Sequence, residues 1–559
     1  MNTVELTGAE ILLECLLEQG CDSIFGYPGG QVLPIYDALY KYQDKIKHYL
    51  VSHEQGASHA ADGYARATGK AGVCLATSGP GATNLVTGIA TAYMDSSPVV
   101  AITGNVAVAM LGKDSFQEVD ITGVTMPITK HNFIVKDVRL LADTIRQAFH
   151  IARSGRPGPV LVDIPRDISV SVCEYTYEAP VPLHKDSSRL TEEALDEAAA
   201  ILAASEKPFI YSGGGVIAAA ASDELVKFAD LLSAPVCVSA MGIGGFPYSN
   251  DKFTGMIGMH GTAASNTLAT ECDCLIAVGA RFSDRVICNV ARFAPNAKIL
   301  HIDIDPAEID KNVLTAHSLV GDVADVLSQL NGRLKAGAKP EWLERMRGLK
   351  TEIPLGYTMK EDELKPQYII ERISALAAGK AIITTEVGQH QMWACHYMQV
   401  EEPRRFISSG GLGTMGFGLG ASIGAAVSHP GTTVFNIAGD GCFRMNNIEL
   451  ATAVEYDLPV IVVILNNHAL GMVRQWQNLF FGQRYSHTSL HTKTTDFCKL
   501  AEAYQAKAFN VTKASEVDEV ILEAMALKKP VVINCEINAD EKVFPMVPIG
   551  AGLDQYILK

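Results

Sequence analysis

Residues 433–441, which read T-V-F-N-I-A-G-D-G, carry the strongest fold signal in the chain. An apolar, β-branched run precedes Gly439-Asp440-Gly441, and a second such run, residues 460–465, ends in Asn466-Asn467. Residues 447–455, between the two runs, read as a helix. A strand, a helix and a second strand in this order predict one βαβ unit with two neighbouring parallel strands.

The same alternation of short β-branched runs and Ala/Leu-rich stretches extends over the 559 residues. It predicts an α/β fold with parallel sheets flanked by helices. Three further runs read as buried strands, at residues 73–77, 98–103 and 160–164. Two Pro-containing polar stretches, residues 179–189 and 337–366, read as boundaries. We therefore predict three domains, at residues 1–180, 190–340 and 365–559.

The composition indicates a packed globular protein. Hydrophobic residues make up 48% of the chain and charged residues 19%, which argues against disorder. Lys and Arg total 46 against 62 Asp and Glu, so the formal net charge is −16. This acidic balance repels phosphate backbones, and we expect no nucleic-acid partner.

Three features of the sequence indicate the compartment. The first residues, M-N-T-V-E-L-T-G-A-E, are acidic rather than basic, so no secretory signal is expected. The apolar runs fall short of the roughly 18 residues of a spanning helix, and no membrane is expected. The 12 cysteines lack the usual zinc spacing and read as reduced core residues. We expect a cytoplasmic protein.

Asp440 and Asn467 follow the two strands of the βαβ unit. Open α/β sheets bind ligands at the carboxyl ends of their strands, so both side chains are expected at that edge. A carboxylate and an amide oxygen form a hard-oxygen pair suited to Mg²⁺. Either motif alone would read as a turn or a cap, whereas the two at this spacing favour a metal site.

Two other Gly-rich segments are weaker signals. Residues 411–416, G-L-G-T-M-G, satisfy the dinucleotide pattern G-x-G-x-x-G, but residues 404–407 before them form a poor first strand. Gly69-Lys70 does not complete a phosphate-binding P-loop, because Tyr64 and Ala71 stand where Gly and Ser or Thr are required.

Gly439-Asp440-Gly441 with Asn466-Asn467 resembles the signature of the thiamine-diphosphate enzymes. More narrowly, residues 4–555 resemble the catalytic subunits of the biosynthetic acetohydroxyacid synthases (acetolactate synthases). The segments that carry this resemblance are V-S-H-E-Q-G-A (51–57), T-S-G-P-G-A-T-N (77–84), S-F-Q-E-V-D (115–120), S-G-R-P-G-P (154–159), R-F-S-D-R-V (281–286) and L-G-M-V-R-Q-W-Q (470–477). The resemblance implies an N-terminal pyrimidine-binding domain, a central FAD-binding domain and a C-terminal domain for diphosphate and Mg²⁺.

The resemblance also implies roles for residues around thiamine diphosphate. Glu54 matches the glutamate that shares a proton with N1′ of the aminopyrimidine, and Met415 matches the apolar residue that holds the cofactor folded. The carbonyl of Gly413 would accept a hydrogen bond from the 4′-amino group. The implied Mg²⁺ ligands are Asp440, Asn467 and the backbone carbonyl of Ala469. Further contacts are implied at Val387, Gly388, Gln389, His390, Gly441, Cys442 and Met472.

Two residues match the family's substrate contacts. Arg285 would bind the carboxylate of the second 2-keto acid, a task that suits a planar guanidinium. Trp476 would contact the extra methyl group of 2-ketobutyrate and so favour it over pyruvate as acceptor. Gly30, Phe116 and Gln117 resemble residues that line the reacting centre from the neighbouring subunit.

The resemblance further implies FAD, although joining two keto acids with loss of CO₂ is redox-neutral. The expected contacts are Gly213, Gly214, Gly215, His260, Gly261, Thr262, Arg281, Asp303, Asp322 and, from the first domain, Arg156. Ser283 departs from the family's pattern, in which this position is usually acidic.

The implied reaction decarboxylates pyruvate on thiamine diphosphate and joins the hydroxyethyl unit to pyruvate or 2-ketobutyrate. The products, 2-acetolactate or 2-aceto-2-hydroxybutyrate, belong to the biosynthesis of the branched-chain amino acids valine, leucine and isoleucine. The implied assembly is a homodimer or homotetramer with sites across the interface, with a possible small regulatory subunit.

Four alternatives remain open. A pyruvate oxidase would use the flavin to oxidise the intermediate, and a catabolic acetolactate synthase would lack flavin; residues 281–286 together with Trp476 disfavour the latter. An NAD-dependent dehydrogenase and a non-catalytic cofactor-binding protein would both leave the 439–467 unit unexplained.

Overall fold

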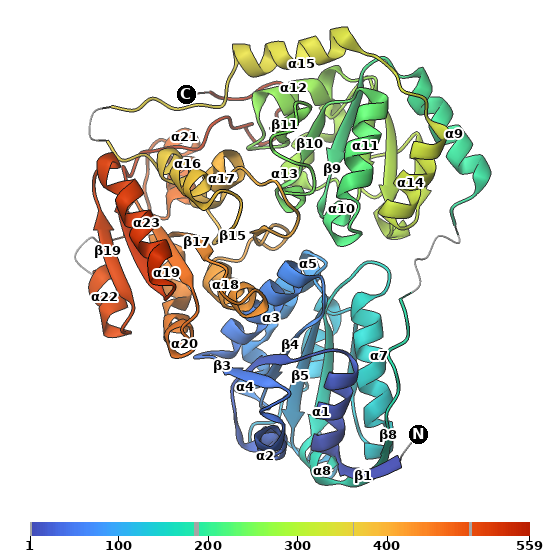
Figure 1. Cartoon of the computed structure of the whole chain (residues 1–559), viewed down its shortest axis with the longest axis vertical. Coiled ribbons are helices and arrows are strands. Elements are labelled where there is room, and N and C mark those ends of the chain that lie inside the picture. The colour runs from blue at the N-terminus through green and yellow to red at the C-terminus, as the bar shows by residue number, and fades with distance from the viewer. Residues whose placement is uncertain (1–2, 184–188, 361–362, 491–494, 559) are drawn as a thin grey trace.

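The computed structural model describes residues 3–183, 189–360, 363–490 and 495–558. Three lobes follow one another along the chain, one at the bottom of Figure 1, one at the upper right and one at the left. Each contains a parallel sheet covered by helices on both faces, which confirms the predicted α/β class. Residues 184–188 of the expected linker lie outside the described residues.

The N-terminal domain is built on the sheet β3-β2-β4-β5-β7-β6. Its strands are β2 (Ser23–Gly26), β3 (Lys47–Leu50), β4 (Gly72–Ala76), β5 (Val99–Asn105), β6 (His131–Ile134) and β7 (Val160–Pro165). Helices α1 (Gly8–Glu18) and α7 (Leu141–Arg153) pack on one face, and α3 (Glu54–Thr68) and α5 (Val86–Met94) pack on the other. The strands predicted at 73–77, 98–103 and 160–164 are therefore confirmed within one or two residues.

One sheet element of this domain was not predicted. Strands β1 (Thr3–Thr7) and β8 (Val172–Thr176) form a two-stranded antiparallel ribbon outside the main sheet. The buried carboxylate of Glu18 stabilises the chain beside it, because it accepts hydrogen bonds from the Tyr175 hydroxyl, the Glu178 N–H and the Arg146 guanidinium.

The central domain is built on the sheet β11-β10-β9-β12-β13-β14. Its strands are β9 (Pro208–Ser212), β10 (Val236–Val238), β11 (Phe253–Met256), β12 (Cys274–Val278), β13 (Lys298–Asp303) and β14 (His317–Val320). Helices α9 (Glu192–Ala204), α11 (Ser222–Leu232) and α14 (Val323–Arg333) pack on one face, and α12 (Ala263–Glu271) packs on the other.

The stretch 337–366, which reads as a boundary, contains the helix α15 (Pro340–Glu352). Trp342, Met346 and Leu349 recur at helical spacing and are buried against the central domain. The Trp342 indole donates a hydrogen bond to the Pro208 carbonyl at 2.8 Å. The charged residues of this segment are the exposed face of an amphipathic helix.

The C-terminal domain is built on the sheet β16-β15-β17-β18-β20-β19. Its strands are β15 (Ile382–Thr385), β16 (Phe406–Ile407), β17 (Val434–Gly439), β18 (Val460–Asn466), β19 (Lys507–Val511) and β20 (Val531–Glu536). Helices α16 (Pro366–Ala377), α17 (Gln389–Tyr397) and α23 (Val517–Leu527) pack on one face. Helices α18 (Phe417–Ser428), α20 (Leu450–Glu455) and α22 (Phe497–Ala503) pack on the other.

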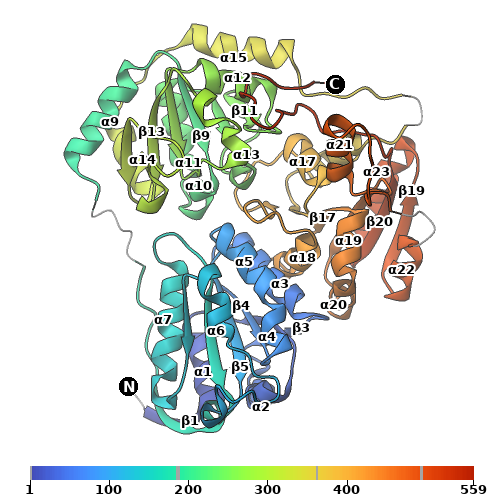
Figure 2. The ribbon, with the colours of Figure 1, turned by 180° about the vertical axis from the view of Figure 1, so that it is seen from behind.

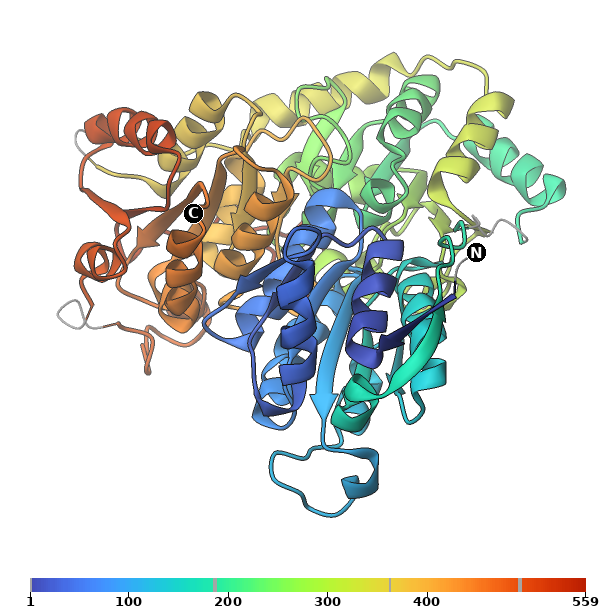
Figure 3. The same ribbon diagram turned by 60° about the horizontal axis from the view of Figure 1, so that its bottom comes forward.

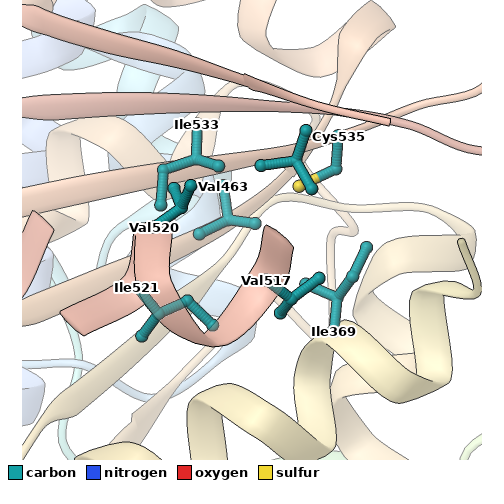
Figure 4. A pocket seen from close by; sticks show the side chains of 8 residues that line it. Ile369, Val463, Val517, Val520, Ile521, Ile533 and Cys535 are labelled. Carbon is teal, nitrogen blue, oxygen red and sulfur yellow. The ribbon is translucent and has the colours of Figure 1, made fainter. Parts of the chain in front are cut away.

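A small pocket lies inside this domain, between the sheet and helices α16 and α23 (Figure 4). Only Val, Ile and Cys side chains line it. A pocket without polar groups cannot orient a charged cofactor, so we assign it to core packing.

The last described residues cross from the C-terminal domain to the central domain and lie near α12 and α15 (Figure 2). The Val547 N–H donates to the Met259 carbonyl at 2.7 Å, and Leu553 is fully buried in the central core. Among the helices of the described ranges, none combines the length and the apolar character that a membrane crossing requires.

Helices α3 and α18 join the N-terminal and C-terminal domains through small residues. A Cβ placed on Gly424 would lie 1.9 Å from the Ala60 carbonyl oxygen, and one on Gly63 would lie 2.2 Å from the Ala421 carbonyl oxygen. Because the backbones approach this closely, neither position has room for a methyl group.

Gly424→Ala is therefore expected to lower the free energy of unfolding by about 1–3 kcal/mol, the usual cost of overpacking a tight interface. Gly332→Ala is the matched control, since Gly332 also lies in a helix, α14, but nothing lies within 4 Å of its added Cβ. Thermal denaturation should show a lower midpoint for Gly424→Ala alone. Equal midpoints for the two variants would contradict the packing described.

Candidate active site

Two strand ends of the C-terminal domain bring Asp440 and Asn467 to one edge of the sheet. Strands β17 and β18 pair in parallel, with Gly439 opposite Leu465. Asp440 follows β17 directly and opens the helix α19 (Asp440–Asn446), which was not predicted. The helix predicted at 447–455 is confirmed, since η8 (Asn447–Glu449) and α20 cover those residues. The adjacency expected from the βαβ unit is present.

The carboxyl of Asp440 is 2% exposed. Burial, which penalises the charged form, raises its pKa to about 6. A carboxylate withdrawn from water in this way is stabilised as an anion by a nearby cation. Its chemistry therefore fits a Mg²⁺ site.

The amide of Asn467 is oriented by its neighbours. Its Oδ1 accepts the Ala469 N–H at 3.1 Å, and its Nδ2 donates to Oε1 of Gln389 at 3.2 Å. Gln389 in turn donates to Oε1 of Gln475 and to the Glu541 carbonyl, both at 2.9 Å. This network directs the Asn467 oxygen toward the turn that contains Ala469, the third ligand expected for Mg²⁺.

His390, at the start of α17, lies beside the same strand ends. A Cβ on Gly439 would lie 2.7 Å from its ring and one on Gly388 2.8 Å, so both glycines leave space for the imidazole. Burial lowers the pKa of His390 to about 3, which keeps the ring neutral. Its Nε2 is buried and has no hydrogen-bond partner among the described residues. An unpartnered polar atom at this edge fits the phosphate side of a cofactor.

Met415 lies next to the opening of α19. A Cβ on Gly441 would lie 3.9 Å from its terminal methyl group. Gly413 and Gly416 flank it with φ of +69° and +86°, a conformation that favours glycine. The Cys442 thiol donates to the Val387 carbonyl at 3.1 Å, which joins the turn after β15 to this helix. Met472 lies in α21 (Gly471–Phe480), where it is half-buried and packs against buried apolar side chains.

Glu54 lies at the start of a helix in the N-terminal domain, as Asp440 does in the C-terminal domain. It is the first residue of α3, is 8% exposed, and its Oε2 accepts a hydrogen bond from the Asn84 amide at 2.9 Å. A Cβ on Gly81 would lie 3.2 Å from Glu54 Oε1 and 2.8 Å from the Thr77 side chain. The segment 77–84 thus surrounds the carboxyl, and Asn84 is a partner that the sequence analysis did not single out.

Gly30, Phe116 and Gln117 lie on loops of the same domain. Gly30 opens the short helix η1 (Gly30–Val32) and is exposed. A Cβ on Gly79 would lie 2.8 Å from the Gln117 carbonyl oxygen, so the base of the loop after β5 packs against the segment 77–84. Phe116 itself is 83% exposed. The loop after β5 projects from the N-terminal domain at the bottom of Figure 3.

Arg285 and Trp476 meet from different domains. Arg285 lies on α13 (Asp284–Ile287) of the central domain and Trp476 on α21 of the C-terminal domain. The guanidinium carbon lies 5.9 Å from the centre of the indole ring. The Arg285 side chain is 63% exposed, so it remains accessible to a carboxylate.

The residues expected around FAD follow three neighbouring strands of the central domain. Gly213 follows β9, Arg281 lies three residues after β12, and Asp303 ends β13. A Cβ on Gly213 would lie 2.3 Å from the Gly279 carbonyl oxygen, and one on Gly215 2.6 Å from its Cα, so the packing of these loops requires both glycines. Gly214 has more space, since its Cβ would lie 3.3 Å from the Met241 carbonyl oxygen.

The other residues expected around FAD divide by environment. Asp322 and Thr262 are N-caps of α14 and α12, which accounts for both side chains without a ligand. Gly261 packs against the Asn266 amide. The buried rings of His260 and His301 each have an Nδ1 without a partner among the described residues. These unpartnered atoms fit a ligand with many hydrogen-bonding groups.

Arg156 reaches this edge from the N-terminal domain. One guanidinium nitrogen lies 3.1 Å from a carboxylate oxygen of Asp305 and 2.7 Å from one of Glu308. Its Nε donates to the Ser96 hydroxyl at 2.8 Å. The structure therefore places Arg156 in an ion-pair cluster between domains, and Asp305 of this cluster lies two residues along the chain from Asp303.

Comparison with known proteins identifies this architecture. Three family profiles match the chain: the N-terminal thiamine pyrophosphate binding domain at residues 6–124, the central domain of thiamine pyrophosphate enzymes at 195–330, and the C-terminal thiamine pyrophosphate binding domain at 386–535.

Several known proteins are similar to this chain over almost its whole length. The chain is 48% identical over 567 residues to a probable acetolactate synthase large subunit of Methanocaldococcus jannaschii, covering 99% of this chain and 95% of the relative. It is 47% identical over 564 residues to an acetolactate synthase of Mycobacterium bovis, covering 99% and 91%. It is 45% identical over 565 residues to an acetolactate synthase large subunit of Pyropia yezoensis, covering 99% and 95%.

Proposed function

The chain belongs to the thiamine pyrophosphate enzymes, among the acetolactate synthase large subunits, and from that premise we propose how its residues carry out the reaction. It decarboxylates pyruvate and joins the remaining two-carbon unit to a second 2-keto acid, giving 2-acetolactate or 2-aceto-2-hydroxybutyrate. The observation that carries this function is full-length identity of 43–48% to acetolactate synthases, with Asp440 and Asn467 adjacent at one sheet edge.

Thiamine diphosphate, when bound, supplies the carbanion centre that takes up and decarboxylates a 2-keto acid. Asp440, Asn467 and the Ala469 carbonyl would hold Mg²⁺, which suits oxygen ligands and substrate phosphates. His390 would donate or accept a hydrogen bond on the diphosphate side. The buried Asp440 carboxyl and the unpartnered His390 Nε2 support both assignments.

Glu54 holds a proton at N1′ of the aminopyrimidine in this proposal. The half-buried Asn84 amide orients the carboxyl, and the burial of the Glu54 side chain limits its contact with bulk water. A carboxyl held in this way acts as general acid and base at one ring atom. Met415 would keep the cofactor folded so that its amino group reaches C2.

We propose a homodimer as the smallest active unit. Within one chain, the neighbours of Glu54 include Asn84 and Gly81 of the N-terminal domain. Asp440 and His390 lie among residues of the C-terminal domain. A second copy would bring its Glu54 to the first copy's Asp440. Mixing inactive Glu54→Gln with inactive Asp440→Asn should then restore activity, because mixed dimers contain one intact site. Absence of any restored activity in verified mixed dimers would contradict the shared site.

The pair Arg285 and Trp476 is proposed as the acceptor site. The guanidinium would bind the acceptor carboxylate, and the indole ring would contact its alkyl group. Their separation of 5.9 Å, with the arginine exposed, supports a joint role.

Trp476→Leu is expected to lower the preference for 2-ketobutyrate over pyruvate by about tenfold, because one methylene contact is worth roughly 1–3 kcal/mol. Acetolactate formation from pyruvate alone should remain within a few-fold of wild type. The product ratio in competition between the two acceptors measures the effect. Phe480→Leu, a neighbouring aromatic on α21 that is 41% exposed, is the control. An unchanged ratio in Trp476→Leu would exclude this role.

FAD is proposed for the edge of the central sheet, supported by the unpartnered Nδ1 atoms of His260 and His301. Since the reaction is redox-neutral, the flavin would be structural. Flavin absorbance in the purified protein tests its presence. Peroxide and acetate formed with consumption of O₂ would instead identify a pyruvate oxidase, and full turnover without flavin would identify the catabolic type.

The remaining proposals concern assembly and compartment. The names of the relatives as large subunits support a small regulatory partner. The 12 cysteines are free, and burial raises the pKa of eleven of them, which suits a reducing cytoplasm.

A further inference from the structure

Glu449 is a buried carboxylate that the function proposed above leaves without a role. It is the last residue of the short helix η8 (Asn447–Glu449) in the C-terminal domain and is 1% exposed. Its contacts cross to the N-terminal domain. Oε1 accepts the N–H of His53 at 2.9 Å and of Ser52 at 3.2 Å, and Oε2 accepts the Thr452 hydroxyl at 2.7 Å.

These two N–H groups directly precede Glu54, the first residue of α3. A helix start leaves its first N–H groups without partners inside the helix, and a negative charge there is favourable. The side chain of His53 accepts the Gln55 N–H, and Glu449 fixes the two residues before it. A side chain of the C-terminal domain therefore fixes the backbone of the two residues that precede Glu54.

The fit around Glu449 is close. A Cβ on Gly56, in the first turn of α3, would lie 2.2 Å from Glu449 Oε1, so a larger residue would displace the carboxylate. Burial raises the pKa of Glu449, and the hydrogen bonds from Thr452, Ser52 and His53 oppose that rise. Burying a carboxylate is unfavourable unless hydrogen bonds compensate for the lost hydration. Glu449 receives these hydrogen bonds from the two residues before α3 and from Thr452.

We infer that Glu449 is a positioning residue, which sets the orientation of Glu54 through hydrogen bonds to the Ser52 and His53 N–H groups. This inference rests on the proposed role of Glu54 as the proton-sharing group. Glu449 does not touch substrate or cofactor in this scheme. It acts through the backbone of the same chain.

Two substitutions separate geometry from charge. Glu449→Gln keeps the length and an accepting oxygen, and its amide can donate to Thr452. Glu449→Asp keeps the charge but is one methylene shorter, so it withdraws from the two N–H groups. If positioning is the role, the glutamine variant remains close to wild type and the aspartate variant loses activity.

The matched control is Tyr456→Phe. The Tyr456 hydroxyl also accepts a backbone N–H of the N-terminal domain, that of Leu50, at 2.8 Å, four residues before Glu54. It joins the same two domains without reaching the start of α3. A general weakening of domain contact would affect this variant as it affects Glu449→Asp.

Two readouts are measured on the full-length protein. The first is the rate of exchange of the C2 proton of bound thiamine diphosphate, expected to fall about 10- to 100-fold in Glu449→Asp, as misplacement of a reacting group by about 1 Å does elsewhere. The second is amide hydrogen exchange in residues 51–57, expected to accelerate at least about tenfold in the same variant. Glu449→Gln and Tyr456→Phe should remain within about threefold of wild type in both.

The outcomes are distinct. Slow C2 exchange in Glu449→Asp with normal exchange in Glu449→Gln supports positioning. Normal C2 exchange in Glu449→Asp, or slow exchange in Glu449→Gln alone, overturns it. Glu54→Gln, measured in parallel, tests the proposed function itself. C2 exchange at the wild-type rate in Glu54→Gln would overturn the role of Glu54. Slow C2 exchange in Glu54→Gln together with a wild-type rate in Glu449→Asp would overturn only the inference about Glu449.

Discussion

Glu54→Gln is expected to lower turnover by about 1,000-fold while thiamine diphosphate affinity stays within a few-fold of wild type. A positioned acid or base contributes roughly 10²- to 10⁴-fold, and the amide can neither take up nor release the proton at N1′. The substitution keeps the size of the side chain, and its oxygen can still accept the hydrogen bond from Asn84. Binding is therefore preserved when catalysis is lost.

Steady-state turnover and cofactor titration of the same preparation measure the two effects. Glu5→Gln is the control, because it makes the same chemical change on the exposed strand β1. It should be indistinguishable from wild type. Turnover of Glu54→Gln within a few-fold of wild type would remove Glu54 from the mechanism.

Asp440→Asn is expected to weaken Mg²⁺-dependent binding of thiamine diphosphate by at least about 100-fold. Loss of a residue that hydrogen-bonds to a metal ligand typically lowers metal affinity about 10- to 100-fold. Loss of the charged ligand itself should lower it at least as much. The protein without cofactor should fold normally, since asparagine replaces a charge that burial disfavours.

Calorimetric titration with thiamine diphosphate at fixed Mg²⁺ measures this loss. Asp457→Asn is the control, because Asp457 is an exposed aspartate in the same βαβ unit, in the turn before β18. It should bind the cofactor as wild type does. Unchanged affinity in Asp440→Asn would place the metal elsewhere.

The C-terminal half of the site was predictable because its pattern is local. Residues 433–467 form two consecutive strands of a βαβ unit, and such strands pair in parallel, so Asp440 and Asn467 must emerge at one edge. Helix α19 was not predicted because Gly439-Asp440-Gly441 reads as a turn, whereas Asp440 begins a short helix.

Other parts depend on contacts between residues distant in sequence. Glu449 contacts the N–H of His53, 396 residues earlier, and no periodicity in either segment indicates this pairing. Arg156 matches a flavin contact of the family by its motif, yet in the structure its charge is met by Asp305 and Glu308 of another domain. Side chains that act across domains are fixed by tertiary packing and not by local pattern.

The products formed by the purified chain test the account most directly. With pyruvate, thiamine diphosphate, Mg²⁺ and FAD, the purified chain should form 2-acetolactate and release one CO₂ for each acetolactate formed. Addition of 2-ketobutyrate should divert the product to 2-aceto-2-hydroxybutyrate. Acetate and peroxide formed in step with O₂ consumption, with no acetohydroxyacid, would contradict it.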